Sequence, residues 1–287
     1  MKVEIWSDVV CPFCYIGKRR FEDGLRQFDH PEAVDVVWRS FELTPDFRPV
    51  PGQSIHESLA AKKGVSPAEG RRMSDHMAGV AKEVGLTYDF ERTVPANTFL
   101  AHQLIHLGGH HGVQDATKER LFAAYYTEGR DLNDLDTLVR LGTEVGLDAA
   151  EIRQALVAGT YAEAVRYDEY QAQQIGVRGV PFFVFDDKYA VSGGPAGRAV
   201  HRSARQSVGR SPGGQAATRG RGRPRRWPRL RPRRLRLIVS PPAARNRAPP
   251  VLAGLGFAWG PWATAGGPSS GVHLGWAARA VGGRILA

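Results

Sequence analysis

The chain of 287 residues contains only two cysteines, Cys11 and Cys14, which lie three positions apart in the stretch SDVVCPFCYIGK. Apolar and polar residues alternate over residues 2–6, just before this stretch, and predict a short β-strand. After it, Cys14, Phe21 and Leu25 recur at helical spacing. The pair is therefore expected at a tight turn from a strand into a helix, with Cys11 at the helix N-terminus.

This position suits thiol chemistry. A cysteine at a helix N-terminus faces unpaired backbone N–H groups and the positive end of the helix dipole. The first cysteine of Cys-X-X-Cys motifs has a pKa of roughly 3.5–7.5, so we expect Cys11 to be a nucleophile with a lowered pKa. Pro12 suits the first helical turn, and Cys14 is placed to attack a mixed disulfide on Cys11. Phe13 adds no charge, which favours a less oxidising pair than a motif with histidine.

A second informative stretch, GVPFF at residues 179–183, places a proline at the entry to a segment of strand character. Cis X–Pro bonds are a minority and usually serve a purpose. We expect the bond between Val180 and Pro181 to be cis. Because proline has no N–H, this arrangement would leave the backbone of Val180 free to pair with an incoming peptide.

The remaining pattern defines the order of elements. Residues 34–43 are rich in β-branched and aromatic side chains and predict a second strand. The pattern from residue 55 to about 174 is helical, and residues 179–193 return to strand character with a hairpin turn at Asp187. This order predicts a parallel strand pair with a right-handed crossover, and an antiparallel hairpin on the same sheet.

Helix boundaries within the helical segment follow from capping residues and glycines. Three pairs of residues predict helix starts: Ser66 with Glu69, Asn133 with Asp136, and Asp148 with Glu151. Glycines predict helix ends at three places: Gly85, Gly108–Gly109 and Gly146.

Charge divides the chain unequally. The formal net charge is +10, but 18 of the 39 lysines and arginines lie in residues 195–287, while all 29 acidic residues precede them, so residues 1–194 carry a net charge of −8. The stretch 219–237 has scattered prolines and no usable period, which is typical of disorder. A shifted reading frame in a GC-rich gene produces this composition. We therefore interpret residues 195–287 as a disordered Arg/Pro/Gly-rich tail and a frameshift product.

Three stretches resemble the DsbA-like thiol–disulfide oxidoreductases of the FrnE-type subgroup. They are IWSDVVCPFCYIGKRRFE, ANTFLAHQLIHL and GVRGVPFFVFDDKYAVSG, and the resemblance covers about residues 1–193. It implies an α/β, thioredoxin-like fold in which residues 1–54 and 175–194 form the thioredoxin-like domain and residues 55–174 an inserted helical domain. The family continues with a helix that covers the sheet, whereas GPAGRAVHRSARQS lacks the apolar face that such a helix needs.

The resemblance also implies an activity on protein or small-molecule disulfides, as an oxidoreductase or isomerase. Cys11 would be the nucleophile and Cys14 the resolving cysteine. The residues expected to bind substrate are Pro12, Phe13, Asn97, Val180 and Pro181. No bound cofactor or metal is implied beyond the redox-active cysteine pair, and glutathione is a candidate co-substrate.

Three alternatives remain open at this point. The related 2-hydroxychromene-2-carboxylate isomerases and kappa-class glutathione transferases act on small aromatic substrates, but they typically carry serine where this chain has Cys11. A basic-tailed, non-enzymatic protein associated with nucleic acid is the second alternative. The third is a zinc site formed by the cysteines with His102 and His106, which lie four residues apart.

The distribution of apolar residues along the chain indicates its cellular location. The N-terminus shows no apolar stretch of signal-peptide length, and no 18 consecutive apolar residues occur. A cytoplasmic protein is expected, where a lone cysteine pair favours catalysis over a structural disulfide. We expect no membrane partner and no specific nucleic acid, and the sequence leaves a homodimer open.

Overall fold

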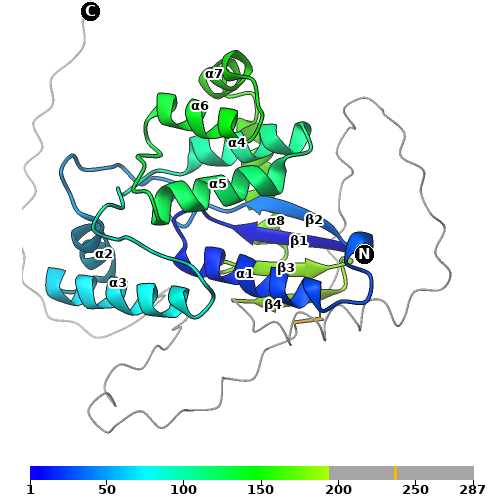
Figure 1. Ribbon diagram of the computed structural model, residues 1–287, viewed down its shortest axis with the longest axis horizontal. Helices are drawn as coiled ribbons and strands as arrows, with labels where there is room; N and C mark the ends of the chain where they lie inside the picture. Colours follow the sequence, from blue (N-terminus) through cyan, green and yellow to red (C-terminus); the bar gives the residue numbers. More distant parts are fainter. Residues whose placement is uncertain (194–235, 238–287) are drawn as a thin grey trace, which may run out of the picture. The chain divides into compact units, whose positions relative to one another are not determined.

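The computed structural model describes residues 1–193 and 236–237. These residues contain a five-stranded sheet in the order β2-β1-β3-β4-β5 (Figure 1). Its strands are β1 (Lys2–Ser7), β2 (Asp35–Ser40), β3 (Phe182–Phe185), β4 (Tyr189–Ser192) and β5 (Arg236–Leu237). The pair β1–β2 is parallel, whereas β3 is antiparallel to both β1 and β4. The expected β-α-β unit and closing hairpin are thus confirmed, in a thioredoxin-like fold.

Helix α1 (Pro12–Arg26) connects β1 to β2. The helices between β2 and β3 are α2 (Ile55–Lys63), α3 (Pro67–Lys82), α4 (Phe99–His110), α5 (Gln114–Tyr126), α6 (Leu135–Glu144), α7 (Ala149–Ala158) and α8 (Ala162–Gln174). A short 3₁₀ turn, Pro31–Ala33, precedes β2. Figure 1 shows α4 to α7 stacked on the β2 side of the sheet, with α2 and α3 as a separate pair.

The two faces of the sheet are covered by helices from different parts of the chain. Successive side chains of a strand point to opposite faces, so Ile5 and Trp6 of β1 face different layers. Phe183, the neighbour of Ile5 on β3, packs with its ring centroid 5.8 Å from that of Phe21 on α1. On the other face, the Trp6 indole donates a hydrogen bond of 2.9 Å to the carbonyl oxygen of Asp168 on α8. The first strand is therefore buried on both sides.

Two of the predicted helix starts are confirmed and one is wrong. Ser66 forms a reciprocal capping box at the start of α3, and the Asp148 carboxylate accepts a hydrogen bond from a backbone N–H of α7. The start predicted at Asn133 lies one residue too early. Asp134 is the N-cap of α6, because its carboxylate reaches the N–H groups of Asp136 and Thr137.

Of the helix ends predicted at glycines, two are confirmed and one is wrong. Gly85 and Gly146 follow helices with φ values of +75° and +91°, as expected for helix ends. Gly108 and Gly109 instead lie inside α4. A Cβ at Gly108 would lie 2.3 Å from Thr117 Oγ1 on α5, so this glycine serves the close approach of the two helices.

The hairpin turn lies where the sequence places it. Asp186 and Asp187 both have positive φ, 47° and 55°, in the three-residue loop between the paired residues Phe185 and Tyr189. The prediction of a disordered tail at residues 195–287 lies outside the described residues, apart from Arg236–Leu237, which pairs in parallel with β4. The domain boundaries stay a prediction.

Candidate active site

Cys11 is the N-cap residue of α1, as predicted, and it precedes Pro12 at the first helical position. Its N–H donates to the carbonyl oxygen of Asp8 at 3.3 Å, and its carbonyl oxygen accepts from the N–H of Cys14 at 2.9 Å. These bonds form the tight turn that carries the chain from β1 into α1. Both cysteines are free thiols, with 5% of Cys11 and 1% of Cys14 exposed.

The Val180–Pro181 bond is cis, which confirms the prediction. The Cys11 thiol lies against it, because Sγ donates to the carbonyl oxygen of Val180 at 3.4 Å. The carbonyl of Pro181 accepts from Gly193 N–H at 2.8 Å, whereas no described residue accepts a hydrogen bond from the N–H of Val180. Two segments 169 residues apart thus meet at the Cys11 sulfur.

The expected low pKa of Cys11 is wrong for this conformation. A hydrogen bond with the Cys14 thiol, complete burial and the negative charges of Cys14 and Asp8 together raise the pKa of Cys11 well above its usual value. The helix N-terminus acts in the opposite direction, but the hydrogen bond with Cys14, which is the largest contribution, and burial outweigh it.

Asp8 is fully buried at the end of β1, and it is charged. Burial alone raises its pKa, but the hydrogen bond and charge of His102 and the N–H of Leu43 outweigh this and hold the pKa below its usual range. The bonds measure 3.3 Å to His102 Nε2 and 2.8 Å to Leu43 N. Burial in turn lowers the pKa of His102. The carboxylate therefore adds a fixed negative charge beside the cysteines.

This arrangement argues against the zinc alternative. His102 Nε2 faces Asp8, and His106 Nε2 lies 3.1 Å from both Ser40 Oγ and Asp168 Oδ2. Neither cysteine belongs to the group of potential metal ligands that the described part of the chain contains.

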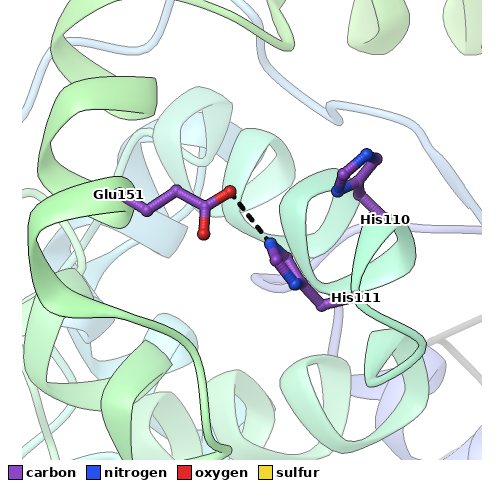
Figure 2. A group of neighbouring side chains, drawn as sticks. All are labelled: His110, His111 and Glu151. Carbon is purple, nitrogen blue, oxygen red and sulfur yellow. Dashed lines mark hydrogen bonds and ion pairs between the residues drawn. The ribbon is translucent and has the colours of Figure 1, made fainter.

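That group lies elsewhere, at the C-terminal end of α4. His110, His111 and Glu151 place one ligand atom each within 4.8 Å of one another. Figure 2 shows the Glu151 carboxylate pointing to His111, with a separation of 2.9 Å between Oε1 and Nε2. A divalent transition metal could bind these atom types. The contact already serves to join α4 to α7.

Aromatic rings surround the cysteine turn. The Tyr88 hydroxyl donates to the carbonyl oxygen of Pro12 at 2.8 Å. Tyr15, which follows Cys14, stacks on Phe122 of α5 with ring centroids 4.7 Å apart. Phe13 is only partly buried and borders the same core.

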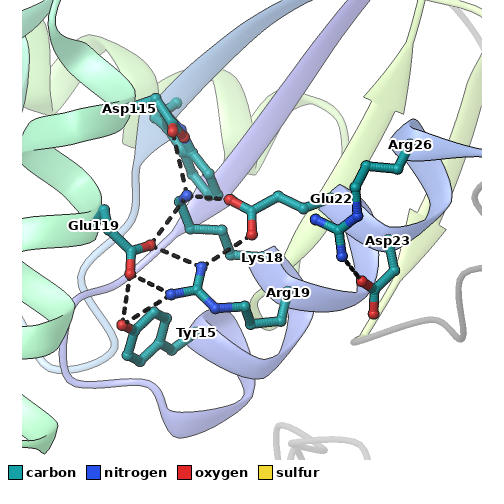
Figure 3. A network of polar contacts seen from close by, with 9 residues as sticks. Tyr15, Lys18, Arg19, Glu22, Asp23, Arg26, Asp115 and Glu119 are labelled. Carbon is teal, nitrogen blue, oxygen red and sulfur yellow. Dashed lines mark hydrogen bonds and ion pairs between the residues drawn. The ribbon is translucent and has the colours of Figure 1, made fainter. Parts of the chain in front are cut away.

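A network of ion pairs attaches α1 to α5 (Figure 3). Lys18 is 2% exposed and lies 3.2 Å from Asp115 and 3.1 Å from Glu119, and it also pairs with Glu22. Glu119 also pairs with Arg19, and it accepts a hydrogen bond of 2.7 Å from the Tyr15 hydroxyl. The network holds the helix that carries both cysteines.

Asn97, predicted to bind substrate, has a different set of partners. Its amide donates to the carbonyl oxygens of Pro45 and Phe47, at 3.1 Å and 3.2 Å, and its Oδ1 accepts from Phe99 N–H. It therefore joins the proline-rich loop to the start of α4. No described contact joins it to the cysteines, and its substrate role stays a prediction.

The sequence predicts that Asp8, close to Cys11, either raises the pKa of Cys11 or caps a turn, but it does not indicate the roles of Lys118 and His102. Lys118 of α5 is 1% exposed and was not identified, and His102 was considered only as a metal ligand. The spacing of Asp8 and Cys11 was the one available signal, since both lie on the same turn.

Comparison with known proteins shows the family of this chain. A family model described as DSBA-like thioredoxin domain matches residues 2–202. The chain therefore belongs to this family of thiol–disulfide oxidoreductases. Within the described residues, no helix is both long and apolar enough to cross a bilayer.

Individual relatives support the assignment. A solved structure from Streptomyces coelicolor, described as a probable DsbA oxidoreductase, is 37% identical, covers 76% of this chain and 94% of its own, and has a TM-score of 0.69. The uncharacterized protein YwbO of Bacillus subtilis (strain 168) is 29% identical over 204 residues, 70% of this chain and 94% of YwbO. A 2-hydroxychromene-2-carboxylate isomerase shares the fold, with 19% identity, a TM-score of 0.53, and coverage of 74% and 100%.

Proposed function

We propose that this protein exchanges disulfides through Cys11 as nucleophile and Cys14 as resolving cysteine. The observation that carries the proposal is the position of Cys11 Sγ, at the start of α1 and 3.4 Å from the carbonyl oxygen of Val180. A thiol in this position can meet a disulfide whose flanking backbone pairs with the strand that follows Pro181.

The reaction has two steps. The Cys11 thiol loses a proton, and its sulfur attacks one sulfur of the substrate disulfide. The substrate S–S bond breaks, and the departing sulfur takes up a proton. Cys14 then attacks Cys11 Sγ in the mixed disulfide and releases the second substrate thiol. The enzyme pair is oxidised by two electrons and the substrate disulfide is reduced by two, and the reverse sequence oxidises a dithiol.

Three features support binding of an extended peptide near Val180. Its N–H has no acceptor among the described residues, Pro181 offers no N–H, and β3 begins directly afterwards. Pro12 and Phe13, which are both half-buried in the cysteine turn, would border the bound chain. We propose that the backbone of the bound substrate accepts a hydrogen bond from the N–H of Val180.

Substrates in this proposal are protein or small-molecule disulfides in the cytoplasm, with glutathione as a candidate co-substrate. The isomerase alternative is supported by the fold that this chain shares with a 2-hydroxychromene-2-carboxylate isomerase. The intact cysteine pair favours disulfide exchange instead, because an isomerase has no need for a resolving thiol. A homodimer stays a proposal.

The test compares two cysteine variants in a dithiol-dependent insulin reduction assay. Cys11→Ser should abolish activity, since no nucleophile remains, whereas Cys14→Ser should form mixed disulfides that persist and are detected by mass spectrometry. Normal insulin reduction by folded Cys11→Ser protein would contradict the proposal.

A further inference from the structure

Two imidazoles and one carboxylate converge where the C-terminal end of α4 meets the first turn of α7 (Figure 2). His110 is the last residue of α4, His111 is its C-cap, and Glu151 lies in the first turn of α7. Each offers one ligand atom, and these atoms lie within 4.8 Å of one another. Two histidines and a glutamate are a known ligand set of zinc sites with three protein ligands. Disulfide exchange at the cysteines uses none of them.

The spacing of the ligand atoms is close to what a metal ion requires. Bonds of about 2.0–2.2 Å to a tetrahedral zinc place two ligand atoms about 3.3 Å apart. His111 Nε2 and Glu151 Oε1 are already 2.9 Å apart. The remaining ligand is the His110 imidazole, whose ring centroid lies 5.1 Å from that of His111. A small rotation of its side chain would therefore complete the set.

His110 is free to make this rotation. Its side chain is exposed, and it forms no hydrogen bond or ion pair with any residue of the segments that the structure describes. By contrast, the hydrogen bond between His111 and Glu151 joins two helices by itself. A purely structural contact between α4 and α7 needs only that pair. His110 is the residue whose role distinguishes a metal site from such a contact.

The two helix ends favour both a cation and a charged carboxylate at this position. The C-terminal end of a helix carries a partial negative charge, and its N-terminal end a partial positive charge. His110 and His111 lie at the negative end of α4, where a bound cation is stabilised. Glu151 lies at the positive end of α7, where its ionised form is stabilised, and its N–H donates to Asp148 Oδ1 at 2.8 Å.

We propose that His110, His111 and Glu151 form a surface site for a divalent transition metal of the zinc class. Imidazole donors select zinc, copper or nickel over magnesium, which prefers oxygen ligands. Three protein ligands leave one position of a tetrahedral ion for water. A bound ion would fix α7 against α4, the helix that carries His102 beside the cysteine turn. The site uses neither cysteine, so the inference is independent of the proposed function.

The experiment measures zinc binding to the full chain, without an affinity tag, by isothermal titration calorimetry. Cys11 and Cys14 are first oxidised to a disulfide, so that no thiolate binds the metal. Wild type should bind zinc chloride and should not bind magnesium chloride. His110→Ala should weaken zinc binding by at least about tenfold, since even the loss of a group that only supports a ligand costs that much. His76→Ala, at an exposed position of α3, should bind zinc as wild type does.

Glu151→Gln serves as a second variant, because it keeps the shape of the side chain and removes the charged ligand. It should also weaken zinc binding by at least about tenfold. Zinc affinities of both variants equal to that of wild type would overturn the inference. Magnesium binding as tight as zinc binding would also contradict it, because imidazole ligands do not favour magnesium.

Thermal unfolding provides a second readout. Without metal, wild type and His110→Ala should melt at the same temperature, because His110 has no polar partner in the described part of the chain. Excess zinc should raise the melting temperature of wild type, because a ligand that binds only the folded state stabilises it. The same zinc concentration should leave His110→Ala unchanged. An equal rise in both proteins would place the bound zinc elsewhere and refute the site.

Discussion

At the scale of single residues, the position of Cys11 follows from its neighbours in sequence, but its ionisation does not. The strand before it and Pro12 after it place it at the N-cap. Its raised pKa depends on Cys14, on burial and on Asp8, and burial is produced by segments far away in the sequence. Asp8 is the one of these contributors that can be changed without altering the dithiol.

Asp8→Asn should lower the pKa of Cys11, because it removes a negative charge that opposes the thiolate. Asn can still accept the hydrogen bond from Leu43 N–H, so the turn is retained. The thiolate fraction then rises at any given pH below the pKa, and the rate of alkylation by iodoacetamide as a function of pH should shift to lower pH. Asp75→Asn, at an exposed position, is the control. An upward shift for Asp8→Asn would refute this role of Asp8.

At the scale of elements, close packing and charge pairing decide how the helices sit around the cysteine turn. Gly108 allows α4 to approach α5, and α5 carries both Lys118 and the carboxylates that bind Lys18 of α1. Displacement of α5 would therefore alter the environment of the cysteines as well as the core.

Gly108→Ala should destabilise the protein by about 1–3 kcal/mol, the usual cost of overpacking a tight contact. The new Cβ would meet Thr117 Oγ1 on α5. Gly79→Ala is a matched control within α3, where a Cβ meets nothing within 4 Å. It should stabilise the protein by roughly 0.5–1 kcal/mol through helix propensity. Urea unfolding of both variants measures the difference, and an equal effect of the two would contradict the packing argument.

At the scale of the whole molecule, the helices inserted between β2 and β3 complete the site. Helices α4 and α5 supply His102 and Lys118, and the loop between α3 and α4 supplies Tyr88, while the cysteines and Pro181 come from the ends of the described segment. All of these residues precede residue 194.

A chain shortened to residues 1–194 should therefore keep the insulin-reducing activity of the full chain. Of residues 195–287, the structure describes only Arg236–Leu237, which pairs with β4 at the sheet edge farthest from β2. Insulin reduction and thermal melting of the two chains provide the comparison. Loss of activity in the shortened chain, with its melting temperature unchanged, would show that residues 195–287 contribute to function.

Local sequence patterns were sufficient to predict the closing hairpin, the cysteine turn, the cis bond at Pro181 and two of the three helix starts. Each of these depends on residues within a few positions of one another, as with Ser66 and its capping partner. The prediction of a helix end at Gly108 failed because this glycine serves the close contact between α4 and α5. The prediction of a helix start at Asn133 failed because the side chain of the next residue, Asp134, caps α6.

The tertiary structure alone decided the electrostatics of the site. Asp8, His102 and Lys118 are 94 and 16 residues apart along the chain, and no spacing rule relates them. Their charges affect the cysteines only because folding removes water from between them, and in a low-dielectric interior each buried charge alters the ionisation of its neighbours. The sequence alone therefore predicts which residues can react, while the packing of the inserted helices determines how readily their thiols ionise.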